Sequence, residues 1–239
     1  MSGARVLEIK GTVVQGFEGA RDAFAANFEK GGEVGASFAV WKDGDYLVDL
    51  WGGHADSALS KPWVRDTLPN VWSTTKAVGA LCIAMLVERG LLSYDDKITK
   101  HWPEFGAHGK DVLTVGQVMS HQSGVSTVRE PLKTEDLFDH DKMARRMAAA
   151  EPLWKPGTRS GYHALTYAFP TGELVKRLTG KSIGQFFREE VAGPCEIDFH
   201  IGLPDSADDR AAEMLPAKNA APLNGDGMTD IQKLTFSNP

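Results

Sequence analysis

A predicted helix that follows Ser73-Thr74-Thr75-Lys76 is the feature that most constrains this chain. Its apolar residues recur at spacings of three and four and therefore share one helix face. They are Val78, Leu81, Cys82, Met85 and Leu86. Gly90 follows two polar residues, at the position where a left-handed residue ends a helix. The pattern therefore predicts that Ser73 lies at or just before the start of the helix.

Ser73 and Lys76 stand three residues apart, which brings the ammonium and the hydroxyl together within one helical turn. A serine nucleophile needs a group that takes its proton, and a partly desolvated lysine can do so. Exposed amides at a helix start can also stabilise an oxyanion. The alternative is a serine N-cap followed by a surface lysine, and these residues taken alone favour that alternative.

The composition sets outer bounds. The chain has 239 residues, a formal net charge of −6 and 42% hydrophobic residues, enough for a core in one large domain or two small ones. The acidic balance argues against nucleic acid as a partner. Two isolated cysteines give neither metal-ligand spacing nor a disulfide framework. No run has the length of a signal peptide or a membrane span, so we expect a soluble cytoplasmic protein with no membrane contact.

The segment before Ser73 predicts a helix and a β-hairpin. One helix face carries Phe17, Ala20, Phe24 and Phe28. Two β-rich runs, 35–41 and 46–51, are joined at an Asp-Gly and predict an antiparallel hairpin. These two strands are the only ones that the sequence predicts, and a helix before a hairpin indicates a sheet covered by a helix.

The stretch after Gly90 predicts mainly helices. Thr114 and Gln117 have the capping-box pattern for a helix over 115–120, and a second helix is predicted over 134–150. A third runs over 171–178 with Pro170 in its first turn, and Ser182 caps a fourth that extends to 191. From Pro204 onwards large apolar residues are scarce, which predicts mostly loop.

Five stretches together resemble the serine β-lactamase and penicillin-binding fold family, in that family's order. They are Asp49–Gly53, Ser73–Lys76, Leu113–Val115 leading into Ser120–Gly124, Pro156–Thr158 with Gly161–Ala164, and Asp198–Pro204. The closer match is the esterase branch, the family VIII carboxylesterases related to class C β-lactamases. One such motif would be weak, but five in order over roughly residues 15 to 205 favour Ser73 as a nucleophile over a simple N-cap.

The resemblance implies a role for particular residues. Ser73 matches the nucleophile, Lys76 its lysine partner, and Tyr162 the second-motif tyrosine that helps to shuttle the serine proton. A phenol beside an ammonium has its pKa lowered and can act as a base. His163 stands where histidine is common in the esterase branch, and we take it with Gln122 and Trp72 as candidate substrate-binding residues. His121 and Gln122 are more typical of loop-ordering residues than of catalysts, and Trp72 and Trp154 are more typical of packing.

The resemblance also implies an α/β (α+β) fold of the β-lactamase/transpeptidase-like type: an antiparallel sheet flanked by helices, plus a helical domain. We expect residues 1–70 to form the N-terminal part of the α/β domain, 71–204 the nucleophile helix and helical domain, and 205–239 an irregular tail. Family members continue further and there supply more strands, a third motif and an oxyanion amide, so we expect the α/β domain to be incomplete at its C-terminal end. Pro170 also departs from the family's unbroken helix, which affects the aim of Tyr162.

These patterns favour a serine carboxylesterase that cleaves small carboxylic esters through an acyl-enzyme on Ser73, without metal or organic cofactor. One alternative is a β-lactamase or DD-peptidase-like activity on the same fold. Another is a non-catalytic fragment that acts by binding or assembly, because the third motif is absent. The expected partners are a small-molecule ester and either a C-terminal fragment or a second copy of the chain.

Overall fold

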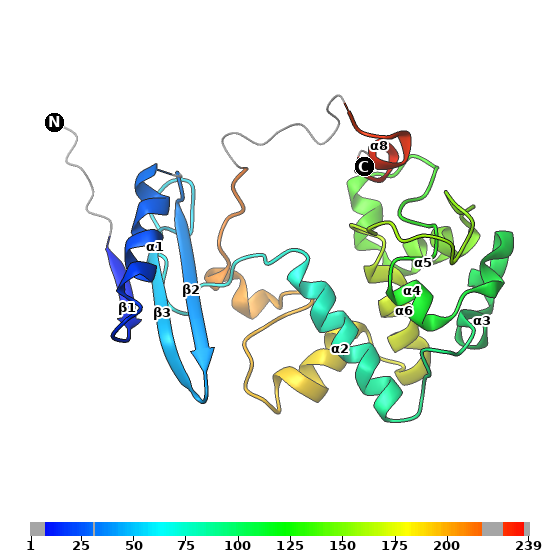
Figure 1. Cartoon of the computed structure of the whole chain (residues 1–239), viewed down its shortest axis with the longest axis horizontal. Helices are drawn as coiled ribbons and strands as arrows, with labels where there is room; N and C mark the ends of the chain where they lie inside the picture. Colours follow the sequence, from blue (N-terminus) through cyan, green and yellow to red (C-terminus); the bar gives the residue numbers. More distant parts are fainter. Residues whose placement is uncertain (1–7, 31, 217–226, 237–239) are drawn as a thin grey trace. The chain divides into compact units, whose positions relative to one another are not determined.

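The computed structural model describes residues 8–30, 32–216 and 227–236, and the chain divides into two compact units (Figure 1). The first unit comprises residues 1–70 and 203–220, and the second comprises residues 71–202 and 221–239. Each unit is described by itself below. In the described residues no helix combines the length and the apolar character needed to cross a membrane.

The first unit is built on an antiparallel sheet, with strand order β1-β3-β2 among the described residues. The strands are β1 (Ile9–Val13), β2 (Gly35–Lys42) and β3 (Asp45–Gly53). Between β2 and β3, Asp43 and Gly44 both have positive φ, as a tight two-residue hairpin turn requires, so the predicted hairpin is confirmed. Strand β1 was not predicted and pairs with the other edge of β3.

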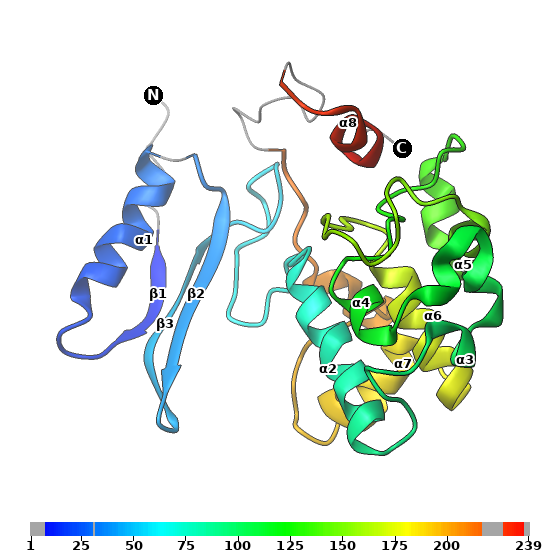
Figure 2. The ribbon, with the colours of Figure 1, turned by 45° about the vertical axis from the view of Figure 1, so that its right-hand side comes forward.

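Helix α1 (Glu18–Lys30) covers one face of this sheet, as Figure 2 shows. Its Phe24 is buried against Val48 and Leu50, the two fully buried side chains of β3. Burying one such side chain stabilises a fold by roughly 1.5–3 kcal/mol, so this small cluster holds the helix on the sheet. The expectation of a sheet covered by a helix is confirmed.

The prediction of an irregular tail over 205–239 is wrong in two places. Residues 205–210 form a 3-10 helix, η4 (Asp205–Arg210), and residues 230–236 form α8 (Asp230–Phe236). After η4 the chain makes a parallel bridge between Leu68 and Ala211 and joins the first unit. Main-chain hydrogen bonds hold this segment in the first unit. Such bonds do not require a pattern of apolar side chains, so the sequence does not indicate them.

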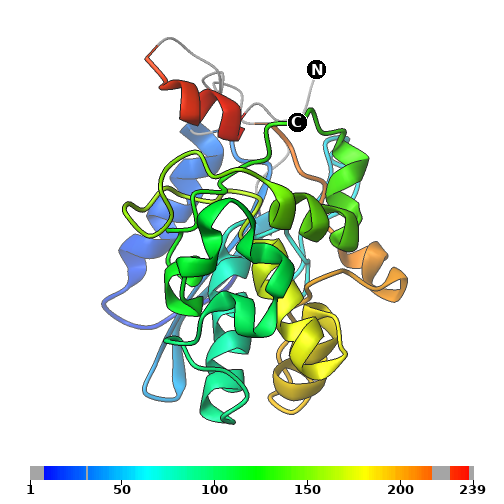
Figure 3. The ribbon, with the colours of Figure 1, turned by 90° about the vertical axis from the view of Figure 1, so that its right-hand side faces the viewer.

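The second unit is helical, and α2 (Thr74–Glu88) is the first of its helices along the chain (Figure 3). Cys82, Ile83 and Leu86 of α2 are fully buried in a core shared with α6 (Ala168–Thr179) and α7 (Ile183–Phe187). Because the apolar face is covered on this side, α2 is fixed in place and so is the residue that precedes it. Gly90 has φ +69° and ends the helix as predicted.

The other helices of the second unit differ from their predictions mainly at breaks. The expected helix over 134–150 is interrupted at Asp139, whose side chain caps the second piece. The expected helix to 191 ends in a π-helical turn, whereas Pro170 does lie in the first turn of α6. The bounds are α3 (Ile98–His101), η1 (Pro103–Val112), α4 (Val115–Met119), η2 (Thr134–Phe138), α5 (His140–Ala149) and η3 (Arg188–Ala192).

Candidate active site

Ser73 immediately precedes α2, and its side chain does not act as a cap. Its backbone is already helical, with φ −74° and ψ −5°, and its hydroxyl makes no capping hydrogen bond. Instead, Ser73 Oγ accepts hydrogen bonds from Lys76 Nζ at 3.1 Å and from Tyr162 Oη at 2.7 Å. The Ser73 hydroxyl therefore accepts hydrogen bonds from two side chains that are chemically able to transfer protons.

Lys76 is held in place by groups from two elements. Its Nζ donates to the carbonyl oxygen of Ala164 at 2.6 Å, in addition to Ser73. The same nitrogen lies 4.9 Å from the centre of the Tyr162 ring and 6.0 Å from that of Tyr167. Cations are attracted to aromatic faces at such distances, so the ammonium is anchored beside the phenol as well as the serine.

Tyr162 combines access to solvent with a perturbed phenol. About half of its surface is exposed, which leaves the site open to a small substrate. The hydrogen bond with Ser73, and after it the neighbouring Lys76 ammonium, lower the pKa of the Tyr162 phenol below its ordinary value. The proline at position 170 does not turn this side chain away, because the phenol reaches Ser73 directly.

His163 is buried, with only 2% of its surface exposed. Its Nδ1 lies 2.6 Å from the carbonyl oxygen of Gly161 and donates to it, so Nε2 accepts from Ser123 Oγ at 2.7 Å. Burial lowers the pKa of His163 to about 4, so the ring is neutral near pH 7. With both ring nitrogens occupied inside the unit, His163 fits a structural role and not the substrate-binding role expected from the sequence.

The other two candidate binding residues have different surroundings. The side-chain amide of Gln122 donates to Ser120 Oγ at 2.8 Å, and the main-chain carbonyl oxygen of Gln122 accepts from the backbone amide of Gly157. These hydrogen bonds order the loop that contains Gln122. Trp72 is 65% exposed and directly precedes Ser73. Its φ of +47° is unusual for a bulky residue, a feature found at functional sites. Trp72 remains a proposed substrate contact.

One residue, His121, has more contacts around Tyr162 than the sequence indicated, whereas Trp154 packs as predicted. His121 lies between Tyr162, His163 and Tyr167, with ring centres 4.9–5.3 Å apart. Trp154 packs beneath the segment before Tyr162 and donates from Nε1 to the carbonyl oxygen of Arg159 at 3.1 Å. The packing role predicted for Trp154 is thus confirmed. Sequence reasoning placed His121 in a polar loop, and no spacing rule linked that loop to Tyr162.

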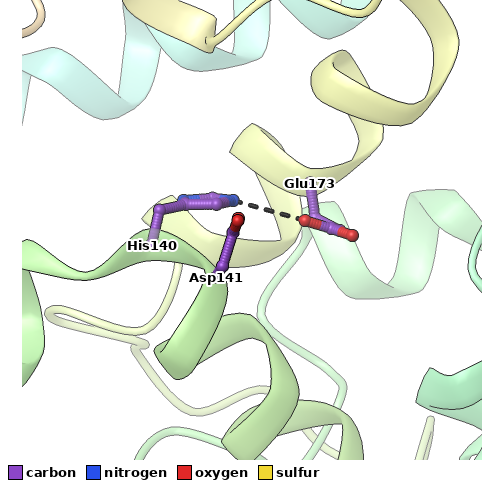
Figure 4. A group of neighbouring side chains, drawn as sticks. All are labelled: His140, Asp141 and Glu173. Atoms are coloured by element: carbon purple, nitrogen blue, oxygen red, sulfur yellow. Dashed lines mark ion pairs between the residues drawn. The ribbon is translucent and has the colours of Figure 1, made fainter.

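One group of side chains in the described residues has the donor types of a metal site: His140, Asp141 and Glu173 (Figure 4). His140 and Asp141 come from the start of α5, and Glu173 comes from α6. Both carboxylates already hold cations of α6, since Lys176 Nζ lies 2.5 Å from Asp141 and Arg177 Nε 2.6 Å from Glu173. The ion pairs of this group therefore link α5 to α6.

The arrangement around Ser73 is suited to nucleophilic catalysis. A hydroxyl, a phenol of lowered pKa and an ammonium lie within hydrogen-bonding or ring-contact distance of one another. The phenolate form can remove the hydroxyl proton while the ammonium stabilises the negative charge, which is the activation that a serine nucleophile needs. Acyl transfer is the reaction class that such a set supports.

Comparison with known proteins gives a consistent result. The beta-lactamase family model matches residues 20–231. Esterase/beta-lactamase LipL from Mycobacterium tuberculosis is 42% identical over 201 residues, which cover 83% of this chain and 46% of that protein. Esterase EstB from Burkholderia gladioli is 32% identical over 178 residues, covering 67% of this chain and 45% of that protein.

Two solved structures have the same fold. A family VIII carboxylesterase is 44% identical with a TM-score of 0.87, and a penicillin-binding protein homologue from Caulobacter crescentus is 39% identical with a TM-score of 0.90. Each match covers 97% of this chain and 62% of the other. The chain thus spans less than half of the two curated relatives and about three fifths of the two solved ones.

Proposed function

The chain belongs to the beta-lactamase family, and on that premise we propose that it is the nucleophile-bearing part of a serine ester hydrolase. The observation that supports this most is the convergence of Lys76 Nζ and Tyr162 Oη on Ser73 Oγ at 3.1 and 2.7 Å. All three residues belong to the second compact unit, so the geometry depends on one folded body.

Acylation begins with transfer of the Ser73 proton to the Tyr162 phenolate, as the new Ser73 oxyanion attacks the ester carbonyl. The Lys76 ammonium stays charged and stabilises both the phenolate before transfer and the alkoxide during attack. The backbone amide of Ser73 donates to the oxygen of the tetrahedral intermediate. Collapse breaks the ester C–O bond, the leaving alkoxide takes the proton from Tyr162, and the acyl group remains on Ser73.

Deacylation reverses the proton movements. Tyr162, again a phenolate, takes a proton from a water molecule that attacks the acyl carbon. The second tetrahedral intermediate releases the carboxylic acid, and Ser73 recovers its proton from Tyr162. Water is the only co-reactant that these steps need.

Small carboxylic esters are the proposed substrates, because two relatives are named esterases and a third is a family VIII carboxylesterase. We further propose that the remaining length seen in those relatives supplies a second oxyanion donor. Loss of one such donor costs roughly a hundred- to a thousandfold in rate. The cytoplasmic location stays a prediction from the sequence.

Cleavage of β-lactams is the second candidate, favoured by the name of the relative esterase/beta-lactamase LipL, which includes both activities. The same Ser73 would then attack a strained amide. Comparing turnover of nitrocefin with that of p-nitrophenyl esters separates the two. Faster ester turnover supports the first candidate, and faster nitrocefin turnover supports the second.

A fluorophosphonate probe tests the shared nucleophile. The wild-type protein should be labelled on Ser73, and Ser73→Ala should abolish the labelling. Thr74→Ala, a neighbouring hydroxyl change, is the matched control and should label normally. Labelling that survives in Ser73→Ala, or that maps to another serine, would refute the assignment.

A further inference from the structure

His121 is bonded to both sequence neighbours of Tyr162. The carbonyl oxygen of His121 accepts from the amide of Gly161 at 3.1 Å, and its ring Nδ1 accepts from the amide of His163 at 3.1 Å. Tyr162 lies between these two anchored amides. One residue therefore fixes the backbone on each side of the tyrosine.

The ring of His121 also contacts the phenol itself. The two ring centres are 5.2 Å apart with a 49° angle between the planes, a tilted aromatic contact. Tyr162 is thus restrained by two main-chain hydrogen bonds and one ring face, all from His121. Its phenol then meets Ser73 Oγ at 2.7 Å.

The backbone of His121 is itself held in an uncommon conformation. Its φ is +64°, in the left-handed region that is uncommon for residues other than glycine and in which asparagine, aspartate and histidine are enriched.

We infer that His121 is a positioning residue that holds the Tyr162 phenol on Ser73, and that it does so only while its Nδ1 carries no proton. The inference rests on the proposed function of Ser73 and Tyr162. A proton on Nδ1 would face the amide proton of His163 and break that hydrogen bond. The restraint on one side of Tyr162 would then be lost.

The surroundings of His121 keep its Nδ1 unprotonated near neutral pH. Lys76 faces it from α2, Tyr162 and His163 face it from the bonded segment, and Tyr167 faces it from the start of α6. Burial, and after it the Lys76 charge, lower the pKa of His121 below its ordinary value of 6.5. Both hydrogen bonds that His121 accepts beside Tyr162 are therefore present at neutral pH. In acid, the one that Nδ1 accepts from the His163 amide is lost.

The test compares two variants that tolerate a left-handed backbone, His121→Asn and His121→Gly. Only asparagine offers a side-chain oxygen near the position of Nδ1, and it cannot be protonated in this pH range. The readout is the rate of Ser73 modification by a fluorophosphonate in the full chain, measured against probe concentration and pH. The maximal rate reports proton removal, and the half-saturating concentration reports probe binding.

We expect His121→Gly to lower the maximal rate by about tenfold to a hundredfold, the scale of a misplaced catalytic group, with little change in half-saturation. His121→Asn should restore most of the rate at neutral pH. On the acid side of neutral pH, the logarithm of the wild-type rate should fall more steeply as the pH is lowered than that of His121→Asn, because one additional protonation acts. If His121→Gly does not fold, the comparison of the wild type with His121→Asn across pH still tests the inference.

Two results would overturn the inference alone. One is a glycine variant that labels Ser73 at the wild-type rate, and the other is an asparagine variant whose pH profile parallels that of the wild type. Absence of Ser73 labelling in the wild type would instead overturn the proposed function, and this inference with it.

Discussion

The buried ring of His163 predicts a specific loss of stability in acid. Its pKa in the folded chain is lowered from 6.5 to about 4, chiefly by burial. Since the folded pKa is below the unfolded one, the stabilising contribution is fully present above pH 6.5 and is lost as the pH falls through about 4. One pKa unit corresponds to about 1.4 kcal/mol, so the full effect is about 3 kcal/mol.

About 2 kcal/mol of this contribution should be lost between pH 7 and pH 5, where most of the unfolded chains carry a protonated His163. The perturbation is His163→Asn, which does not titrate. Asparagine keeps a donor near Nδ1 for the carbonyl oxygen of Gly161, and Ser123 Oγ keeps its bond from the Val125 amide. Any constant cost of the substitution cancels when the pH dependence is compared.

Urea unfolding followed by tryptophan fluorescence, at several pH values between about 5 and 7, gives the free energies of unfolding. The wild type should lose about 2 kcal/mol more than His163→Asn over that range. Parallel pH dependence in the two proteins would mean that folding does not shift the pKa of His163, and would refute the burial argument.

Three further predictions concern the site and the core. Tyr162→Phe and Lys76→Ala should each lower the rate of Ser73 acylation by at least about a hundredfold, and the double variant should lose far less than the product, as stopped-flow rates can show. Lys110 is fully buried, and its burial lowers its pKa to about 8, below the ordinary 10.5. The stabilising contribution of the neutral amine is present above pH 10.5 and lost as the pH falls through 8, so wild-type stability should rise by about 2 kcal/mol between pH 7.5 and 9.5. Lys110→Met should lack that rise in urea titrations. Gly161→Ala would place a Cβ 2.6 Å from the Trp154 ring, so we expect about 1–3 kcal/mol of destabilisation and slower acylation, whereas an unchanged melting temperature would contradict the contact.

The sequence predicted α2, Ser73 and Lys76 because their positions follow short-range rules. Apolar spacing correctly placed Cys82 and Leu86 on the buried face of α2, but Leu81, predicted on the same face, is exposed and Ile83 is fully buried instead. A three-residue spacing brings Ser73 and Lys76 together. The match of Tyr162 to a family motif supplied the third group, which spacing alone does not reach across 89 residues. The distance between the Tyr162 phenol and Ser73 could be known only from the folded structure.

The features that the sequence did not predict depend on long-range main-chain bonds. Strand β1 has only five residues and contains Gly11, whose φ of +98° breaks the strand pattern. A Cβ there would lie 1.8 Å from the carbonyl oxygen of Asp49, so the close approach of β3 explains the glycine. The two hydrogen bonds that His121 accepts come from the backbone amides of Gly161 and His163, which lie 40 or more positions away. Because a backbone amide carries no residue-specific signal, the sequence does not indicate this pairing.

The most direct test of the central claim is to identify the residue that carries the acyl group during turnover. The protein is mixed with p-nitrophenyl acetate, quenched in acid within the pre-steady-state phase, digested and analysed by peptide mass spectrometry. The account predicts one acetyl group on the peptide of Ser73, and strongly reduced acetylation in Tyr162→Phe. Acetylation confined to another residue, or release of p-nitrophenol with Ser73 unmodified, would contradict it.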